Sequence, residues 1–326
     1  MSQNGSITLS HFGPGSTLPL VVQPVHKGLD LAHWATGHRE FIEKNLFTYG
    51  ALLFRDFNLK NVEALEKLIT ALYGKPMPYQ DRATPRTQVQ GNIFTATDYP
   101  PPQHIFVHNE GSFAYHWPGK LFFHCLIPSQ SGGETPLVDV RRVFHRIDAE
   151  IRETFIKKQV MYVRNFGGAF GLKWQDAFQT SDKHEMEVYC RTVGISIEWK
   201  DDEHLRTRQI RPAIAKHPQT NEVVWFNHAT VLHISTVRPE MRDMLVKMCS
   251  EEDLPNNTYY GDGSSIAPEV MDALRAAYHA ETVTFPWKAA DVLLVENLLV
   301  AHGRNPFQGK RNVVVGMAEP MSWADL

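Results

Sequence analysis

The sequence predicts a mainly β protein, a β-sandwich or jelly roll decorated with helical insertions. Short runs rich in β-branched and aromatic residues recur along the 326 residues. Helical patterns lie between these runs but do not alternate with them one for one, which argues against a doubly wound parallel sheet. Apolar residues make up 43% of the chain, enough for the core of one large unit.

The expected strands are short apolar runs bounded by turn-forming residues. They are Ala51–Phe54, Ile105–Val107, Leu121–Leu126, Pro136–Val140, Val160–Arg164, Val223–Phe226, Val283–Phe285, Val292–Val295 and Val313–Met317. The expected helices show apolar residues at helical spacing, and Pro268 suits a first helical turn. They are Leu31–Asn45, Val62–Tyr73, Val143–Lys157, Glu185–Val193, Pro239–Cys249 and Pro268–Ala280.

One long stretch, residues 77–104, has little periodicity and contains three consecutive prolines. Long irregular segments in compact domains often cover a functional site, so we expect an active-site lid. An interdomain linker is the alternative, but the segments on both sides resemble parts of one sheet system. We therefore expect a single domain over residues 1–326.

Charge and cysteine content exclude several classes of protein. A net charge of −3 gives no basic footprint for nucleic acid. The cysteines, Cys125, Cys190 and Cys249, are odd in number and widely spaced, which indicates neither a disulfide framework nor a cysteine zinc site. The N-terminal residues lack a signal-peptide pattern and no run is long enough to span a membrane, so we expect a cytoplasmic protein.

Histidine and acidic residues two positions apart are candidates for metal ligands. Composition alone predicts about two such pairs, so their presence is weak evidence. Context separates the three that occur, His38–Glu40, His108–Glu110 and His279–Glu281. The first lies in a predicted helix, where such positions point apart, and the last spans a helix end.

The pair His108–Glu110 follows the strand-like run IFV, and residues two apart on a strand share a face. Two histidines and one carboxylate on one face suit a non-heme iron(II) oxygenase. His302, after an apolar strand and before an expected glycine turn, is the best third ligand. A histidine that only satisfies a backbone group near a turn is the alternative, and a zinc hydrolase lacks the helical HExxH motif here.

Two further features suit a dicarboxylate cosubstrate. In Gly132-Gly133-Glu134-Thr135 the glycine pair permits a tight turn, and the Thr135 hydroxyl can donate to an anion. Arg311, nine residues after His302, can hold a carboxylate through two hydrogen bonds. A plain hairpin turn and a surface arginine are the alternative interpretations.

These motifs together resemble the TauD/TfdA family of 2-oxoglutarate-dependent dioxygenases over roughly residues 20–320. HNEGSFAYHWPGKLFFHC, GGETPLVD and VLLVENLLVAHGRNPFQGKR resemble its first metal segment, its GG-acid-Thr turn and its distal histidine segment. VVWFNHATVLH and NNTYYGDGSSI resemble blocks of the branch similar to syringomycin-pathway amino-acid hydroxylases. Gly111 and His228 depart from that branch, where we expect a larger residue and a glutamine.

The resemblance implies a double-stranded β-helix (jelly roll) core and a dioxygenase that uses Fe(II), 2-oxoglutarate and O2. His108, Glu110 and His302 align with the metal triad, and Thr135 and Arg311 with cosubstrate contacts. Halogenating relatives replace the carboxylate ligand with Gly or Ala. Glu110 therefore predicts hydroxylation, desaturation or cyclisation instead of halogenation.

The resemblance also implies a small-molecule substrate, an amino acid or amino-acid-derived metabolite, free or presented by a peptidyl carrier protein, in antibiotic-type biosynthesis. A dioxygenase that catabolises sulfonates or carboxylates, and a non-catalytic binding protein on the same fold, are the alternatives. A homo-oligomer is compatible with the sequence. Candidate substrate contacts flank the proposed iron strands: Asn109, Ser112, Phe113, Arg164, Asn227 and His228.

Overall fold

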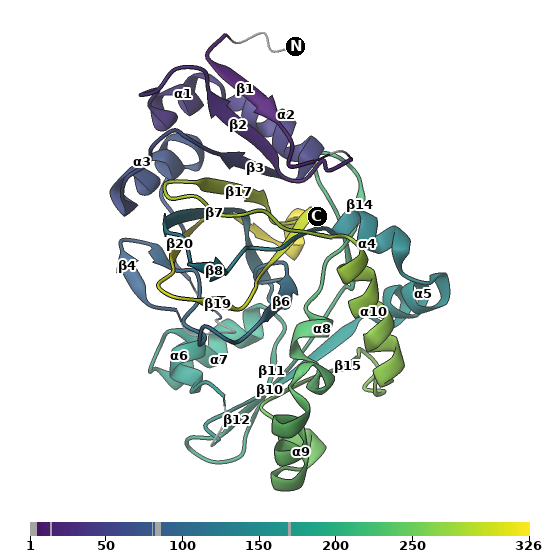
Figure 1. The fold of residues 1–326 in the computed structure, drawn as a ribbon. Helices are drawn as coiled ribbons and strands as arrows, with labels where there is room; N and C mark the ends of the chain where they lie inside the picture. Colours follow the sequence, from purple (N-terminus) through teal and green to yellow (C-terminus); the bar gives the residue numbers. More distant parts are fainter. Residues whose placement is uncertain (1–4, 14, 80, 82–85, 169–170) are drawn as a thin grey trace.

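The largest element of the computed structural model is an eight-stranded sheet (Figure 1). The structure describes residues 5–13, 15–79, 81, 86–168 and 171–326. The strand order in this sheet is β1 (Ile7–Ser10), β2 (Leu20–Pro24), β3 (Ala51–Phe54), β17 (Val292–Glu296), β7 (His116–Ile127), β20 (Asn312–Ser322), β5 (Ile93–Thr95) and β4 (Gln88–Gln90). The predicted apolar runs form its centre.

The large sheet is buried on both faces, because successive side chains of its central strands point alternately into two different cores. On β7, Leu121 and Phe123 point into the main core of the molecule, whereas Phe122 points into a second core beneath helices. On β17, Leu293 faces the main core and Leu294 faces the helices. Both strands therefore appear in the sequence as continuous apolar runs.

Three helices cover the outer face of the large sheet: α1 (Leu31–Gly37), α2 (Arg39–Tyr49) and α3 (Val62–Tyr73) (Figure 1). The sequence predicted one helix over 31–45, and this prediction was wrong. His38 separates α1 from α2, and its Nδ1 donates a hydrogen bond to the Trp34 carbonyl. Side-chain bonds of this kind compete with the helical backbone ladder.

A four-stranded sheet lies against the main core from the other side, in the order β16 (Thr282–Val283), β9 (Leu137–Asp139), β18 (Val300–Arg304), β6 (Ile105–His108). Val107, Val138 and Ala301 of this sheet share the main core with the large sheet. The two sheets therefore form a sandwich, which confirms the mainly β prediction. Neighbouring strands in the four-stranded sheet are antiparallel.

A second four-stranded sheet, β11 (Ser196–Trp199), β12 (Leu205–Arg211), β10 (Val160–Phe166) and β15 (Asn256–Tyr260), extends the molecule, as Figure 1 shows. The remaining strands form the pairs β13 (Ile214–Lys216) with β14 (Val223–Trp225), and β8 (Ser131–Gly132) with β19 (Phe307–Gln308).

Around these strands lie α4 (Val140–Arg146), α5 (Ala149–Lys158), α6 (Trp174–Phe178), α7 (Lys183–Thr192), α8 (Ala229–Leu232), α9 (Pro239–Met248) and α10 (Pro268–Ala280). The bounds of α3 and α10 are those predicted. The single helix predicted over 143–157 is two helices, because Asp148 caps the start of α5 and Ile147 is extended. Among the described residues, no helix is long and apolar enough to cross a membrane.

Residues 77–79, 81 and 86–104, the described part of the predicted lid, carry more regular structure than the sequence indicated, and residues 80 and 82–85 lie outside the described residues. Strands β4 and β5 form a hairpin at one edge of the large sheet, where β5 pairs with β20. The rest of the described segment brings Tyr79, Asp81 and Arg86 into buried positions. Several of these side chains reach the site described next.

Candidate active site

Two of the predicted ligands face each other across a pair of strands. His108 is the last residue of β6, and its Cα partner on β18 is His302. The predicted glycine turn after His302 is wrong, because Gly303 lies inside β18. A Cβ at Gly303 would lie 2.6 Å from the Ile105 carbonyl oxygen, so glycine allows the close approach of β6.

Glu110 lies in the turn that follows β6, two residues after His108. The prediction that His108 and Glu110 share the face of one extended strand is therefore wrong, because the strand ends at His108. Gly111 has a φ of 70°, which turns the chain away immediately after the glutamate. Asn297 fixes this turn from a distance. Its Oδ1 accepts from the Glu110 N–H and its Nδ2 donates to the Glu110 carbonyl, both at 2.8 Å.

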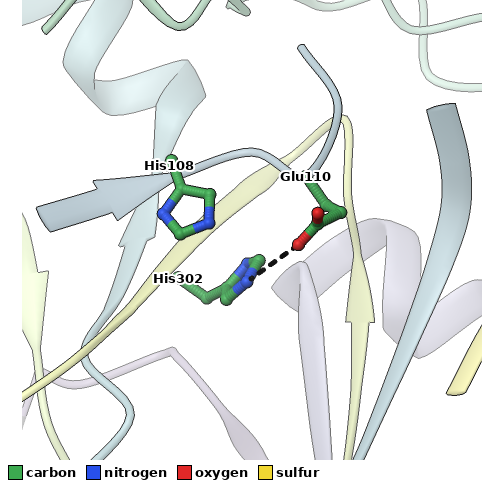
Figure 2. Close-up of side chains that lie close together, drawn as sticks. All are labelled: His108, Glu110 and His302. Atoms are coloured by element: carbon green, nitrogen blue, oxygen red, sulfur yellow. Dashed lines mark ion pairs between the residues drawn. The ribbon is translucent and has the colours of Figure 1, made fainter. Parts of the chain in front are cut away.

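The three side chains converge on one point, as Figure 2 shows. Donor atoms of His108, Glu110 and His302 all lie within 4.8 Å of one another. His302 Nε2 lies 3.8 Å from Glu110 Oε2. His108 Nδ1 donates to the Phe106 carbonyl at 2.8 Å, which leaves Nε2 as its free ligand atom.

The electrostatics of the three residues suit a metal ion. Burial lowers the pKa of His108 and holds that of His302 well below its usual value, so both imidazoles are neutral. Burial alone would raise the pKa of Glu110, but Arg86 and His108 outweigh it and lower that pKa. Neutral imidazoles and an ionised carboxylate are the forms that bind metal, and this donor set fits iron(II).

Arg86 is a site residue that the sequence did not reveal. Its Nη2 forms a buried ion pair with Glu110 Oε2 at 2.6 Å, and its guanidinium lies over the Tyr79 ring. A hydrogen bond from Tyr79 also lowers the pKa of Glu110. Both residues belong to the stretch predicted as a lid, where an arginine in ATPRT gives no signal of its own.

One cavity is lined by two of the predicted metal ligands, His108 and His302, and by both predicted cosubstrate residues, Thr135 and Arg311, but not by Glu110. Its lining comprises Arg86, Ala96, Thr97, Tyr99, Ile105, His108, Phe123, Thr135, His302, Gly303, Arg304 and Arg311. The glycine pair before Thr135 has the predicted positive φ values, 66° at Gly132 and 72° at Gly133, but Gly132 belongs to strand β8 and no turn is assigned to residues 133–135. This cavity therefore joins two of the predicted metal ligands to both predicted cosubstrate residues.

Each cosubstrate candidate is held by a neighbour. Arg311 Nε donates to the Gly133 carbonyl at 2.9 Å, and the Trp287 indole N–H donates to Thr135 Oγ1 at 3.1 Å. Burial, helped by the charge of Arg304, lowers the pKa of Arg311 to about 10. The guanidinium therefore stays protonated at neutral pH and can bind a carboxylate.

The six candidate substrate contacts are all buried, and none of them lines this cavity. Asn227 uses its amide within the fold, donating to the Ala213 carbonyl and accepting from the Ala229 N–H. Asn109 Nδ2 donates to the Asn297 carbonyl at 2.6 Å. Arg164 pairs with Asp81 at 2.8 Å. A role in substrate binding stays a prediction for these residues.

His228 lies beside the metal candidate His108. Its ring centroid is 5.3 Å from that of His108 and 5.3 Å from that of Phe113. Ser112 Oγ is hydrogen-bonded to His228 Nδ1 at 3.0 Å. Burial, and then the neighbouring His108, lower the pKa of His228 to about 3, so this imidazole is neutral.

Comparison with known protein families shows to which family the chain belongs. The family model described as "Taurine catabolism dioxygenase TauD, TfdA family" matches residues 16–318. The chain belongs to the TauD/TfdA family. The family resemblance inferred from the motifs is therefore confirmed over nearly the whole chain.

Two curated relatives extend this result. The dapdiamide synthesis protein DdaC of Enterobacter agglomerans is 40% identical over 280 residues, 86% of this chain and 85% of the relative. The clavaminate synthase-like protein of Arabidopsis thaliana is 29% identical, over 94% of this chain and 89% of the relative.

Solved structures agree on the fold. PvcB from Pseudomonas aeruginosa gives a TM-score of 0.58 at 15% identity, over 98% of this chain and 92% of PvcB. AAD-2, solved with Mn(II) and N-oxalylglycine, gives 0.52 at 13% identity, over 96% of each chain. This TauD/TfdA member is an iron(II)- and 2-oxoglutarate-dependent dioxygenase, with O2 as its other cosubstrate.

Proposed function

We propose that this dioxygenase hydroxylates an unactivated C–H bond of an amino acid or amino-acid-derived metabolite in secondary-metabolite biosynthesis. The substrate is free or tethered to a peptidyl carrier protein. The observation that carries the reaction type is the complete set of His108, Glu110 and His302 around one point. The similarity to the dapdiamide synthesis protein supports the biosynthetic setting.

In this proposal His108, Glu110 and His302 hold the iron, and Thr135 and Arg311 hold the far carboxylate of 2-oxoglutarate. Bound iron with 2-oxoglutarate and O2 supplies the oxidising chemistry that no amino-acid side chain can provide. The chain's own contribution is to fix the ligands on the β6–β18 pair and to enclose the cavity. We further propose that residues 77–104 act as the lid over this cavity, since Tyr79 and Arg86 reach Glu110 from there.

Glu110 supports oxygenation over halogenation, because halogenating relatives have Gly or Ala in place of this carboxylate. Its backbone is held on both sides by Asn297, so the carboxylate does not leave easily. Turnover in the presence of chloride should therefore yield hydroxylated product alone. A chlorinated product that depends on added chloride would contradict this assignment.

The substrate class is tested by measuring succinate release across a panel. The panel contains free amino acids, the same amino acids loaded on a carrier protein, taurine and aryloxyacetates. We expect stimulated succinate release with an amino-acid substrate, and a product mass increased by one oxygen atom. Loss of two hydrogens would indicate desaturation or cyclisation instead. Stimulation by taurine or aryloxyacetates alone would favour the catabolic alternative and contradict the proposal.

A further inference from the structure

Arg86 has spare hydrogen-bond donors in a buried position beside the metal candidates. Its side chain is 4% exposed, and its Nη2 donates to Glu110 Oε2 at 2.6 Å. Within the part of the chain that the structure describes, Nε and Nη1 have no hydrogen-bond partner. Leaving buried donors of a charged group unpaired is costly, so this edge of the guanidinium suits a further acceptor.

We propose that this edge of Arg86 binds the carboxylate of 2-oxoglutarate that lies next to its keto group. The inference rests on the proposed function, because it takes His108, Glu110 and His302 as the iron ligands. Arg86 would then hold one end of the cosubstrate, and Arg311 the other. Arg86 thereby acts as a cosubstrate-binding residue as well as the partner of Glu110.

Arg86 lies beside the metal candidates, and its position therefore favours the carboxylate next to the keto group over the far carboxylate. Arg86 Nη2 contacts Glu110 Oε2, the same oxygen that lies 3.8 Å from His302 Nε2. A guanidinium is planar and rigid, so its other N–H groups lie within a few ångströms of that contact. A ligand that binds the metal beside Glu110 therefore places its oxygens next to Arg86.

Arg311 occupies different surroundings in the same cavity. The charged or titratable neighbours of Arg311 include Arg304, Cys125 and Glu134, whereas those of Arg86 include Glu110, Tyr79 and Asp98. The two cations therefore serve two separate acceptors. A dicarboxylate, with one carboxylate near the metal and one far from it, satisfies both.

Orientation and charge both favour this role. The Tyr79 ring lies 4.8 Å below the guanidinium and, with Glu110, fixes its plane before any ligand arrives. The pair Arg86–Glu110 is neutral, so a divalent ion adds two positive charges to a buried space. An anionic ligand at the free edge of Arg86 reduces this excess.

The test compares two keto acids at saturating Fe(II) under anaerobic conditions, with binding measured by the visible charge-transfer band. One is 2-oxoglutarate, and the other is 2-oxobutyrate, which keeps the keto-acid end but lacks the far carboxylate. Arg86→Gln should raise the Kd of both by roughly tenfold or more. Arg311→Gln, the matched control, should raise the Kd of 2-oxoglutarate and leave that of 2-oxobutyrate within about twofold.

The proposal is overturned if Arg86→Gln binds both keto acids like the wild type, even if its Fe(II) affinity falls, because Arg86 would then only position Glu110. Weaker binding of 2-oxoglutarate alone would also overturn it, by placing Arg86 at the far carboxylate. Arg86→Lys keeps the charge but not the planar fork, so both keto acids should bind severalfold more weakly. This variant decides the question if Arg86→Gln does not fold. A wild type without the band would instead refute the proposed function.

Discussion

His108 and His302 are directly opposed Cα partners on the antiparallel strands β6 and β18. Sheet pairing, and not a flexible loop, therefore sets the spacing of the two imidazoles, whose centroids lie 4.7 Å apart. Glu110 is the exception, because it lies in a turn and depends on other residues for its position.

Asn297 should matter to metal affinity although it has no ligand role. Asn297→Ala removes both hydrogen bonds to the Glu110 backbone and a third to the Pro118 carbonyl. We expect Fe(II) affinity to fall by about 10- to 100-fold, the usual cost of losing a supporting contact of a metal ligand. Anaerobic Fe(II) titration measures this, with Asn45→Ala in α2 as the control. Equal affinities in the two variants would refute the role of Asn297.

Gly111 should be irreplaceable for two reasons. Its φ is 70°, and a Cβ there would lie 3.1 Å from the Trp117 Cβ. Gly28 has a similar backbone, with φ of 91°, but open space around it. Gly111→Ala should lower the free energy of unfolding by roughly 2–4 kcal/mol, against about 1 kcal/mol for Gly28→Ala. Chemical denaturation compares the two, and similar losses would show that the packing against Trp117 is unimportant.

Thr135 should contribute a hydrogen bond to the cosubstrate. The Trp287 indole N–H donates to Thr135 Oγ1, so the hydroxyl proton is free to point elsewhere. Thr135→Val should raise the Kd of 2-oxoglutarate by about tenfold at saturating Fe(II), and Trp287→Phe by less. Iron affinity should stay unchanged in both. If Thr135→Val binds 2-oxoglutarate normally, the hydroxyl does not contact it.

His233 should make the fold less stable in mild acid. Burial, and then Arg275, lower the pKa of His233 to about 4, whereas the unfolded imidazole titrates near 6.5. Between about pH 6.5 and pH 4 the unfolded chain binds a proton that the folded chain does not, so stability falls as pH falls. Above this window both forms are neutral, and below it both are protonated.

His233→Asn offers an amide oxygen in place of Nδ1, which accepts from the Ser235 N–H at 3.1 Å. Between pH 7 and pH 5 this variant should lose less stability than the wild type, with a difference on the order of 1 kcal/mol. Urea unfolding at the two pH values measures the difference. All other buried histidines are present in both proteins, so parallel losses would mean that His233 does not contribute.

The sequence predicted best those elements whose signals are local. Helix α3 was found from apolar residues at helical spacing, helix α10 from the same spacing and from Pro268 in its first turn, and the central strands of the large sheet from their apolar runs. Strand β12, with the sequence LRTRQIR, was missed because most of its residues are polar. Its Thr207 and Gln209 are nevertheless buried.

Within the site, too, residues in local motifs were predicted, and residues placed by the tertiary fold were not. His108, Glu110, Thr135, His302 and Arg311 lie in motifs with a fixed order along the chain, and the structure brings His108, Thr135, His302 and Arg311 to one cavity and Glu110 to its metal end. Asn297 is 187 positions from Glu110, and Arg86 lies in a segment without periodicity. Contacts of this kind depend on the tertiary fold, so no spacing rule could predict them.

His108, Glu110 and His302 are the three proposed iron ligands on which the dioxygenase chemistry depends. Anaerobic addition of Fe(II) and 2-oxoglutarate to the wild type should produce the visible charge-transfer band of the ternary complex. His108→Ala should abolish the band, because the variant loses a ligand set by the β6–β18 pair, while its circular dichroism spectrum stays that of the wild type. A band of unchanged intensity and affinity in His108→Ala would contradict the central claim.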